Sequence, residues 1–218
     1  MGEIQSLWFL TSNAGKLEEA QHILGPLGYQ VSQFKIEGFV PEIIEPQAEW
    51  IEDVAMEKLR QAKEILSDMG RADEAILIED AGLFVDALNG FPGVYSSYAL
   101  KSIGNDGLLR LLDGIEDRAA NFQSVALLWD GERTHSGVGK CPGRISKVAS
   151  EGNGFGFDPI FIPDDLDSEG NSLPKGQRGI TSTDGITFGG VDITVKEKFS
   201  HRKRALGALC ESIARPSS

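Results

Sequence analysis

The hydrophobic pattern at the start of the chain predicts a strand, a helix and a second strand. Residues 6–11 form a short apolar run that ends at Ser12 and Asn13, both of which are favoured at helix N-caps. Apolar side chains then recur at helical spacing through residues 17–24, and residues 29–36 alternate between apolar and polar positions. We therefore expect a β-α-β unit with two parallel strands, which is typical of an α/β fold.

The central part of the chain predicts a long amphipathic helix followed by a buried strand. Apolar positions follow the helical period through residues 49–69, with charged residues on the opposite face. Residues 75–78 are a continuous apolar run, and Glu79 and Asp80 follow it directly. We therefore expect both carboxylates to lie at the C-terminal end of this strand. That is the edge of an α/β sheet at which ligands bind.

The remaining segments predict shorter elements and one long loop. Residues 164–186 contain several Gly, Ser and Thr residues with little periodicity, and loops as long as these 23 residues are usually functional or mobile. The other expected elements are a turn-rich loop at 89–93, a short helix at 106–112, a strand at 122–129 that forms a hairpin with its successor, a glycine-rich loop at 152–159 and a helix at 200–214.

Composition and charge narrow the class of protein. The chain has 218 residues, is 40% hydrophobic and carries 33 acidic against 21 basic side chains, which gives a net charge of −12. This predicts one globular domain over residues 1–218, with two lobes. The sequence has no apolar run near the ~20 residues of a membrane helix, and its acidity argues against a general nucleic-acid surface. With two distant cysteines and no secretory signal pattern, we expect a cytoplasmic protein without membrane or nucleic-acid partners.

Residues 11–16, which read T-S-N-A-G-K, have the features of an anion-binding turn. A strand that ends in small polar residues, with Lys16 in the first turn of the following helix, presents backbone N–H groups and one cation to a ligand. The segment is not a P-loop, because Leu10 stands where that motif requires Gly and Leu17 where it requires Ser or Thr. A capped helix with a solvated lysine is the simpler alternative.

Two acidic segments are candidate metal-binding sites. Glu79 and Asp80 are adjacent carboxylates, and residues 41–57 contain six carboxylates and no Lys or Arg. Mg²⁺ prefers one or two carboxylates together with water and substrate phosphates. Acidic residues are also common at surface turns and at helix N-termini, so a purely structural role stays open for both segments.

Two further segments suit a base and a polyphosphate. Residues 155–158, F-G-F-D, place aromatic rings beside glycine, where a ring can stack on a planar base and Asp158 can hydrogen-bond to its edge. Residues 196–204 contain five Lys and Arg residues against a single Glu in an otherwise acidic chain. Core phenylalanines and a solvated helix face are the corresponding structural alternatives.

Five short blocks occur in order along the chain: T-S-N-A-G-K, I-E-D-A-G-L, N-G-F-P-G-V-Y-S, G-F-G-F-D-P-I-F-I-P and S-H-R-K-R-A-L. In this order they closely resemble the inosine/xanthosine triphosphate pyrophosphatase (Ham1-like) family, from about Phe9 to Leu206. The resemblance implies Mg²⁺-dependent hydrolysis of the non-standard purine nucleotides ITP, dITP and XTP to the monophosphate and pyrophosphate. It also implies a homodimer of α/β subunits, each with an elongated mixed β-sheet flanked by helices, two lobes and a central active-site cleft.

The resemblance further implies roles for individual residues. Asp80 is expected to activate the attacking water and to bind the metal. Glu45 is expected to be the second metal ligand, with Glu42 as its rival. Lys196 is expected to act in catalysis by stabilising negative charge on the polyphosphate. The residues expected to bind the substrate are Thr11, Ser12, Asn13, Lys16, Ala81, Phe155, Gly156, Phe157, Asp158, Lys196, His201 and Arg202.

Three departures from the family's pattern are visible. Ala81 stands where Ser or Thr is usual, Phe157 stands where Tyr or Trp is common, and the loop at 164–186 is longer than the usual connection. We expect that loop to lie over the cleft or to form an extra hairpin. Two other functions stay open: a Maf-like pyrophosphatase for pyrimidine or modified nucleotides, and a nucleotide-binding protein with little turnover.

Overall fold

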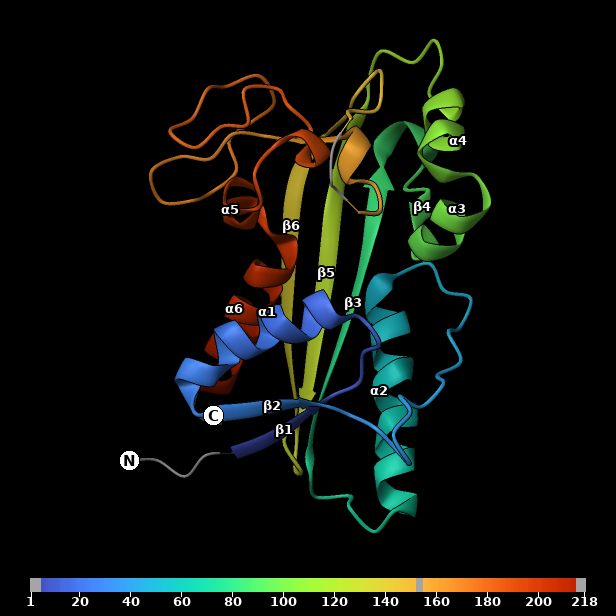
Figure 1. Cartoon of the computed structure of the whole chain (residues 1–218), viewed down its shortest axis with the longest axis vertical. Helices are drawn as coiled ribbons and strands as arrows, with labels where there is room; N and C mark the ends of the chain where they lie inside the picture. The colour runs from blue at the N-terminus through green and yellow to red at the C-terminus, as the bar shows by residue number, and fades with distance from the viewer. Residues whose placement is uncertain (1–4, 152–154, 215–218) are drawn as a thin grey trace. The chain divides into compact units, whose positions relative to one another are not determined.

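A computed structural model describes residues 5–151 and 155–214 of the chain (Figure 1). Residues 152–154, part of the predicted glycine-rich loop, lie outside the described residues. The strands are β1 (Gln5–Phe9), β2 (Tyr29–Gln33), β3 (Ala75–Val85), β4 (Pro92–Gly93), β5 (Ala119–Trp129), β6 (Thr134–Ile145) and β7 (Phe161–Pro163). The helices are α1 (Ala14–Leu24), α2 (Ile51–Asp68), α3 (Ser96–Ser102), α4 (Gly104–Leu111), α5 (Ile193–Lys196) and α6 (His201–Ala214).

The strands of the described residues form one mixed sheet. β1 pairs in parallel with both β2 and β3, so β1, α1 and β2 form the predicted β-α-β unit. The sheet has seven strands in the order β2-β1-β3-β5-β6-β7, with β4 paired to β3. The pairs β3–β4 and β6–β7 are antiparallel. The predicted α/β class, a mixed sheet flanked by helices, is confirmed.

The strand β3 corrects one prediction. We expected Glu79 and Asp80 to lie at the C-terminal end of the strand, but β3 continues beyond both residues to Val85. The prediction was wrong because the apolar run marks only the part of β3 that lies beside β1, whose last paired residue, Phe9, is opposite Leu77. The two carboxylates therefore lie just beyond the end of β1 and in the middle of β3.

The chain divides into two compact units. The first unit comprises residues 1–80, 124–139 and 202–218, and the second comprises residues 81–123 and 140–201. The strands β3, β5 and β6 each contribute residues to both units. Each unit has its own hydrophobic core.

In the first unit, helices cover the strands on both faces. Figure 1 shows α1 and α6 on one side of the strands and α2 on the other. α2 confirms the predicted long helix and buries one stripe of side chains, formed by Ile51, Val54, Ala55, Leu59, Ala62 and Leu66. The core under α1 and α6 consists of Leu7, Phe9, Ala20, Leu24, Val31, Leu77, Ala126, Leu128, Ala205, Leu206 and Leu209. Burying these side chains against the strands is what holds both helix layers in place.

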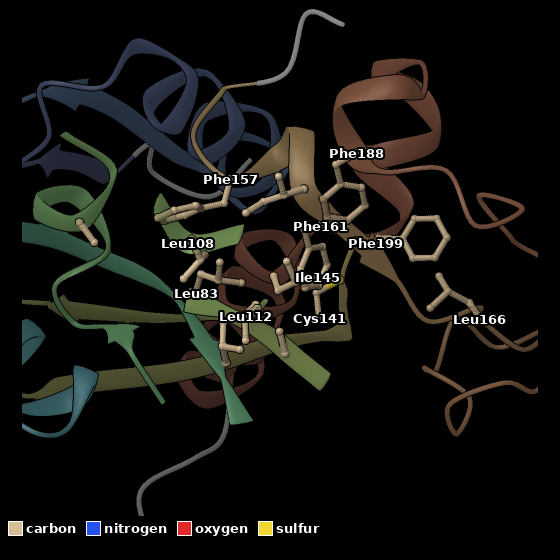
Figure 2. Packing of buried hydrophobic residues seen from close by; sticks show 14 residues of the cluster. Leu83, Leu108, Leu112, Cys141, Ile145, Phe157, Phe161, Leu166, Phe188 and Phe199 are labelled. Carbon is tan, nitrogen blue, oxygen red and sulfur yellow. The ribbon is translucent and has the colours of Figure 1, made fainter. Parts of the chain in front are cut away.

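The second unit has a core rich in phenylalanine (Figure 2). Its four buried phenylalanines are Phe157, Phe161, Phe188 and Phe199. Phe161 and Phe188 lie with ring centroids 5.3 Å apart. Such contacts favour defined ring orientations over a loosely packed interior.

Most of the remaining predicted elements are confirmed. The helices at 106–112 and 200–214 correspond to α4 and α6, and the strand at 122–129 lies within β5, which is followed closely by its sheet neighbour β6. The loop at 164–186 contains only isolated bridges, from Leu166 to Ser172 and to Thr181. The sequence pattern did not indicate α3. No helix within the described residues is both long enough and apolar enough to span a membrane.

Candidate active site

The turn between β1 and α1 has the predicted N-cap. The Asn13 side chain accepts a hydrogen bond from the backbone N–H of Lys16 at 3.1 Å. Thr11 Oγ1 accepts a hydrogen bond from the Asn13 N–H at 3.1 Å. Gln33 of β2 donates to the Thr11 carbonyl at 2.7 Å and so ties the turn to the sheet. Ser12 lies exposed in the same turn. Lys16 lies in the first turn of α1, as expected.

Glu79 is the centre of a buried ionic network in the first unit. Its side chain has no exposed surface and lies 2.6 Å from Lys16 Nζ and 3.2 Å from Arg202 Nε. Ser124 Oγ of β5 donates a hydrogen bond of 2.6 Å to Glu79 Oε1. Arg202 also contacts Glu19 at 2.8 Å. The buried carboxylate is thus compensated by two cations and one hydroxyl, which is what burial of a charge requires.

The surroundings of Glu79 keep it ionised. Burial alone would raise its pKa, but the charges of Lys16 and Arg202, with hydrogen bonds from Lys16 and Ser124, hold the pKa well below its usual range. Burial likewise opposes the charge of Arg202, yet Glu79 and Glu19 raise the Arg202 pKa. Glu79 is therefore a permanent negative charge at any physiological pH.

Asp80, the next residue, has a different environment. Its carboxylate lies 3.2 Å from Lys58 Nζ, and the same ammonium lies 2.7 Å from Glu45. Burial raises the pKa of Asp80, the charges of Lys58 and Lys16 partly offset this effect, and the nearby charge of Glu79 adds to it. A carboxylate with a raised pKa is a stronger base than an ordinary aspartate, which suits a group that accepts a proton.

Asp80 and Glu45 together fit a divalent cation. Both carboxylates contact the ammonium of Lys58, so they lie close to each other. One or two carboxylates are the protein ligands that Mg²⁺ uses when substrate phosphates and water complete its coordination. Among the described residues, no group of three His, Cys, Asp or Glu side chains is arranged to hold a metal. Glu42, the rival ligand, is an exposed residue of the same segment.

The ionic cluster, which we define as Lys16, Glu19, Glu45, Lys58, Glu79, Asp80 and Arg202, has four anionic and three cationic side chains. A polyphosphate would meet one excess negative charge here. Adding one divalent cation reverses the sign of the cluster, so the charge balance itself favours an anionic ligand that arrives with a metal.

The second unit contains a separate group of candidate residues around Asp158. Lys196 Nζ lies 2.6 Å from the nearly buried Asp158 carboxylate. The same ammonium lies 4.2 Å from the centroid of the Phe155 ring, which is within the range of a cation–π contact. Asp158 also accepts a hydrogen bond from the Phe155 N–H at 3.0 Å, and Asn105 donates to the Gly156 carbonyl at 3.1 Å. The segment 155–158 is thus fixed by one hydrogen bond of its own and by contacts from Asn105 and Lys196.

The two phenylalanines of this segment differ in exposure. Phe155 is 64% exposed, whereas Phe157 is 4% exposed and belongs to the core of the second unit (Figure 2). The sequence left two interpretations open for this segment, a ring that stacks on a base and core phenylalanines, and the Phe157 ring is covered by the core. The place of Phe157 in a base pocket stays a prediction. The sequence alternative, a core phenylalanine, holds for Phe157. Phe155 retains an open face.

His201 is oriented by an aromatic neighbour. Its imidazole stacks on Phe122 of β5 with a centroid distance of 4.9 Å and an interplanar angle of 11°. Phe122 in turn packs edge-on against Phe161, with centroids 4.6 Å apart. We call Phe122, Phe155, Asp158, Lys196 and His201 the aromatic cluster. Ala81, the remaining expected binding residue of this unit, is partly buried within β3.

Sequence reasoning missed four residues in or beside these clusters: Glu19, Lys58, Ser124 and Phe122. Lys58 stands four residues after Val54 and four before Ala62, inside the apolar stripe of α2, so a charge in that stripe was the signal. Ser124 is fully buried in β5, where a hydroxyl among apolar neighbours was the signal. Phe122 carried no signal, because only tertiary packing brings it to His201.

The chain is similar to known proteins over nearly its whole length. The sequence model of the Ham1 family matches residues 7–212. A dITP/XTP pyrophosphatase of Thermococcus kodakarensis is 41% identical over 200 residues, with 92% of each chain covered. A dITP/XTP pyrophosphatase of Pyrococcus horikoshii is 40% identical over 205 residues, covering 94% of this chain and 95% of the relative.

Solved structures agree with this relationship. The Ham1 protein of Staphylococcus aureus has a TM-score of 0.75 and 26% identity, with coverage of 96% of this chain and 98% of the other. A nucleoside-triphosphatase, also named dITP/XTP pyrophosphatase, from Mycobacterium abscessus has a TM-score of 0.67 and 30% identity, with coverage of 94% and 98%.

Proposed function

This chain is a member of the Ham1 family, and on that premise we propose that it hydrolyses non-standard purine nucleoside triphosphates (ITP, dITP and XTP) to the monophosphate and pyrophosphate. The observation that carries the proposal is the pairing of Asp80 and Glu45 around Lys58, next to the compensated charge of Glu79. That arrangement supplies a base, a pair of metal ligands and cations for phosphate. The names of the similar proteins, dITP/XTP pyrophosphatase, support the choice of substrate.

In the proposed reaction, the ionic cluster serves the triphosphate. Asp80 orients a water molecule and accepts its proton while the bond between the α- and β-phosphoryl groups breaks. Lys16 and Arg202 each have more N–H donors than their contacts with Glu79 and Glu19 use. Those donors stabilise the negative charge that develops on the leaving pyrophosphate. No covalent intermediate is required.

Mg²⁺ is the cofactor that we propose, with Asp80 and Glu45 as its protein ligands. When bound, it supplies charge neutralisation and polarises the phosphoryl oxygens. The excess negative charge of the ionic cluster supports this assignment, because a tetra-anionic triphosphate would otherwise be repelled.

In the same proposal, the aromatic cluster serves the base. Phe155 offers an exposed ring for stacking, and Asp158, Lys196 and His201 offer hydrogen-bonding groups. A donor that meets the 6-oxo group of hypoxanthine or xanthine would face the amino group of adenine instead, and would be left without an acceptor. We further propose that the protein acts in the cytoplasm as a homodimer, as the family resemblance implies.

The test is pyrophosphate release from a panel of nucleotides. We expect kcat/KM for ITP, dITP and XTP with MgCl₂ to exceed the value for ATP by about 100-fold, because a buried donor left without its acceptor costs about 1–3 kcal/mol. We also expect kcat/KM for these three nucleotides to exceed the value for GTP. A preference for dTTP or UTP would indicate a Maf-like activity instead. Saturable binding of dITP without product would indicate a nucleotide-binding protein. The Asp80→Asn variant, purified in parallel, controls for contaminating phosphatases.

A further inference from the structure

The segment that carries Glu45 has no regular secondary structure of its own. Between the turn at 37–38 and the start of α2, residues 40–48 are neither helix nor strand. Glu45 itself is 59% exposed at its side chain. A ligand in such a segment needs an external contact that fixes its backbone, because a mobile carboxylate loses conformational entropy each time it binds.

One side chain of α2 supplies that contact. Gln61 Oε1 accepts a hydrogen bond from the Ile44 N–H at 3.0 Å, and Gln61 Nε2 donates to the Ile44 carbonyl at 2.8 Å. The amide of Gln61 thus pairs with both backbone groups of Ile44, as a neighbouring strand would. Gln61 Nε2 also donates to Glu57 at 2.9 Å, so its amide is oriented from its own helix.

The position of this contact along the chain is informative. Ile44 precedes Glu45 directly, and Lys58, which contacts Glu45 at 2.7 Å, lies three residues before Gln61 on α2. The backbone before Glu45 and the carboxylate of Glu45 are therefore held by the same stretch of one helix. The Ile44 side chain is 79% exposed, so its own burial does not hold the segment.

We propose that Gln61 is a positioning residue that holds Glu45 at the metal site by pairing with the backbone of Ile44. This proposal rests on the proposed function, in which Glu45 is a ligand of Mg²⁺. Gln61 touches neither the metal nor the substrate. Its loss would leave Glu45 chemically intact but poorly ordered, so metal affinity would fall while the chemical step at saturating metal would not.

Two substitutions test the proposal, with one matched control. Gln61→Met keeps the size and the helix propensity of the side chain but removes both hydrogen bonds. Gln61→Asn keeps the amide but is one methylene shorter, so it cannot reach Ile44. Glu64→Gln changes a residue one turn further along α2 whose ion pair is with Arg60 of the same helix. Circular dichroism and thermal unfolding check that all three variants fold.

The expected results separate positioning from general damage. Because the two lost bonds are exposed and water replaces them in part, we expect the Mg²⁺ concentration at half-maximal rate to rise about fivefold in both Gln61 variants. kcat at saturating Mg²⁺ should stay within about twofold of the unaltered protein. Amide exchange at Ile44, read by NMR, should accelerate by about tenfold. Glu64→Gln should change none of these values.

Direct titration with Mn²⁺, followed by electron paramagnetic resonance, gives a readout that does not depend on turnover. Weaker Mn²⁺ binding in Gln61→Met than in Glu64→Gln would support the proposal even if no nucleotide were hydrolysed, which would count against the proposed function alone. Faster exchange at Ile44 with unchanged metal affinity would overturn the positioning role. Unchanged exchange, wild-type behaviour of Gln61→Asn, or a lack of Mn²⁺ binding by the unaltered protein would also overturn it.

Discussion

The ionic cluster of the first unit and the aromatic cluster of the second handle charge in different ways. In the ionic cluster, the fully buried Glu79 carboxylate is compensated by Lys16, Arg202 and Ser124. In the aromatic cluster there is one compact ion pair, Asp158–Lys196, set against an exposed ring. Fixed, mutually compensated charges suit a group that every nucleotide shares. Aromatic rings and a few hydrogen bonds suit the recognition of one base among bases of similar shape.

The two clusters should therefore lose different amounts of stability when one charge is removed. Removal of the Glu79 charge from the ionic cluster leaves Lys16 without this buried partner and Arg202 with Glu19 alone, which is costly because a buried ion has no water to replace the lost contact. Removal of one charge from the aromatic cluster leaves a lysine that keeps its contact with the Phe155 ring.

Asp80→Asn should lower kcat/KM for dITP by about 10³-fold, which is the scale of losing a general base. Because burial raises the pKa of Asp80, its charge is unfavourable in the fold, and its replacement should leave the thermal midpoint unchanged or higher. Lys58 keeps Glu45 as a partner. Steady-state kinetics and calorimetry measure the two effects; full activity in this variant would exclude Asp80 from catalysis.

Glu79→Gln should lower the stability of the protein, in contrast to Asp80→Asn. It leaves Lys16 and Arg202 facing a neutral amide, and we expect the free energy of unfolding to fall by about 3 kcal/mol. Urea denaturation measures this value. Glu18→Gln, an exposed change on α1, is the control and should leave stability unaltered. A stability loss as small as that of the control would show that the buried network contributes little.

The pH dependence of stability should identify Glu79 directly. Its pKa in the fold lies below its ordinary value of 4.5, so its contribution is fully present above pH 4.5 and is lost as the pH falls further. The free energy of unfolding should fall between pH 6 and pH 3.5 in both proteins. The fall should be smaller in Glu79→Gln than in the unaltered protein, by about 1 kcal/mol. Equal slopes in the two proteins would contradict the lowered pKa.

Asp158→Asn should affect substrate binding more than stability. The variant keeps the acceptor for the Phe155 N–H but loses the ion pair with Lys196. We expect KM for dITP to rise about tenfold, as for a hydrogen bond to a charged group. Asp106→Asn, an exposed change on α4, is the control. A fall in kcat with unchanged KM would assign Asp158 to the chemical step instead.

Phe122→Leu should produce the smallest change. Without its stacking partner the His201 ring is less well oriented, and stacking of this kind contributes about 1 kcal/mol. We expect the preference for dITP over GTP to decrease about fivefold, with little effect on thermal stability, because leucine fills most of the same space. A competition assay with both nucleotides measures the preference for dITP over GTP. An unchanged preference would mean that Phe122 acts only as a core residue.

The sequence predicted those parts of the site that depend on local structure. The N-cap at Asn13 and the helix that follows it are local features, and the periodicity of α2 identified a long helix. The partners of Glu79 were beyond prediction, because Ser124 and Arg202 come from distant segments that only the sheet brings together. Which phenylalanine of the 155–158 segment is covered could not be predicted for the same reason, since a core is defined by contacts between elements.

The pleat of β3 separates the functions of two adjacent acids. Consecutive side chains of a strand point to opposite faces, so Glu79 meets Lys16 of α1 and Arg202 of α6, while Asp80 meets Lys58 of α2. One carboxylate is thereby held as a buried counter-ion with a lowered pKa, whereas burial raises the pKa of its neighbour. An insertion of one residue before Glu79 would move Glu79 into the place of Asp80 and Asp80 into the place of Ala81, so the buried counter-ion of Lys16 and Arg202 would be lost by a change of register alone.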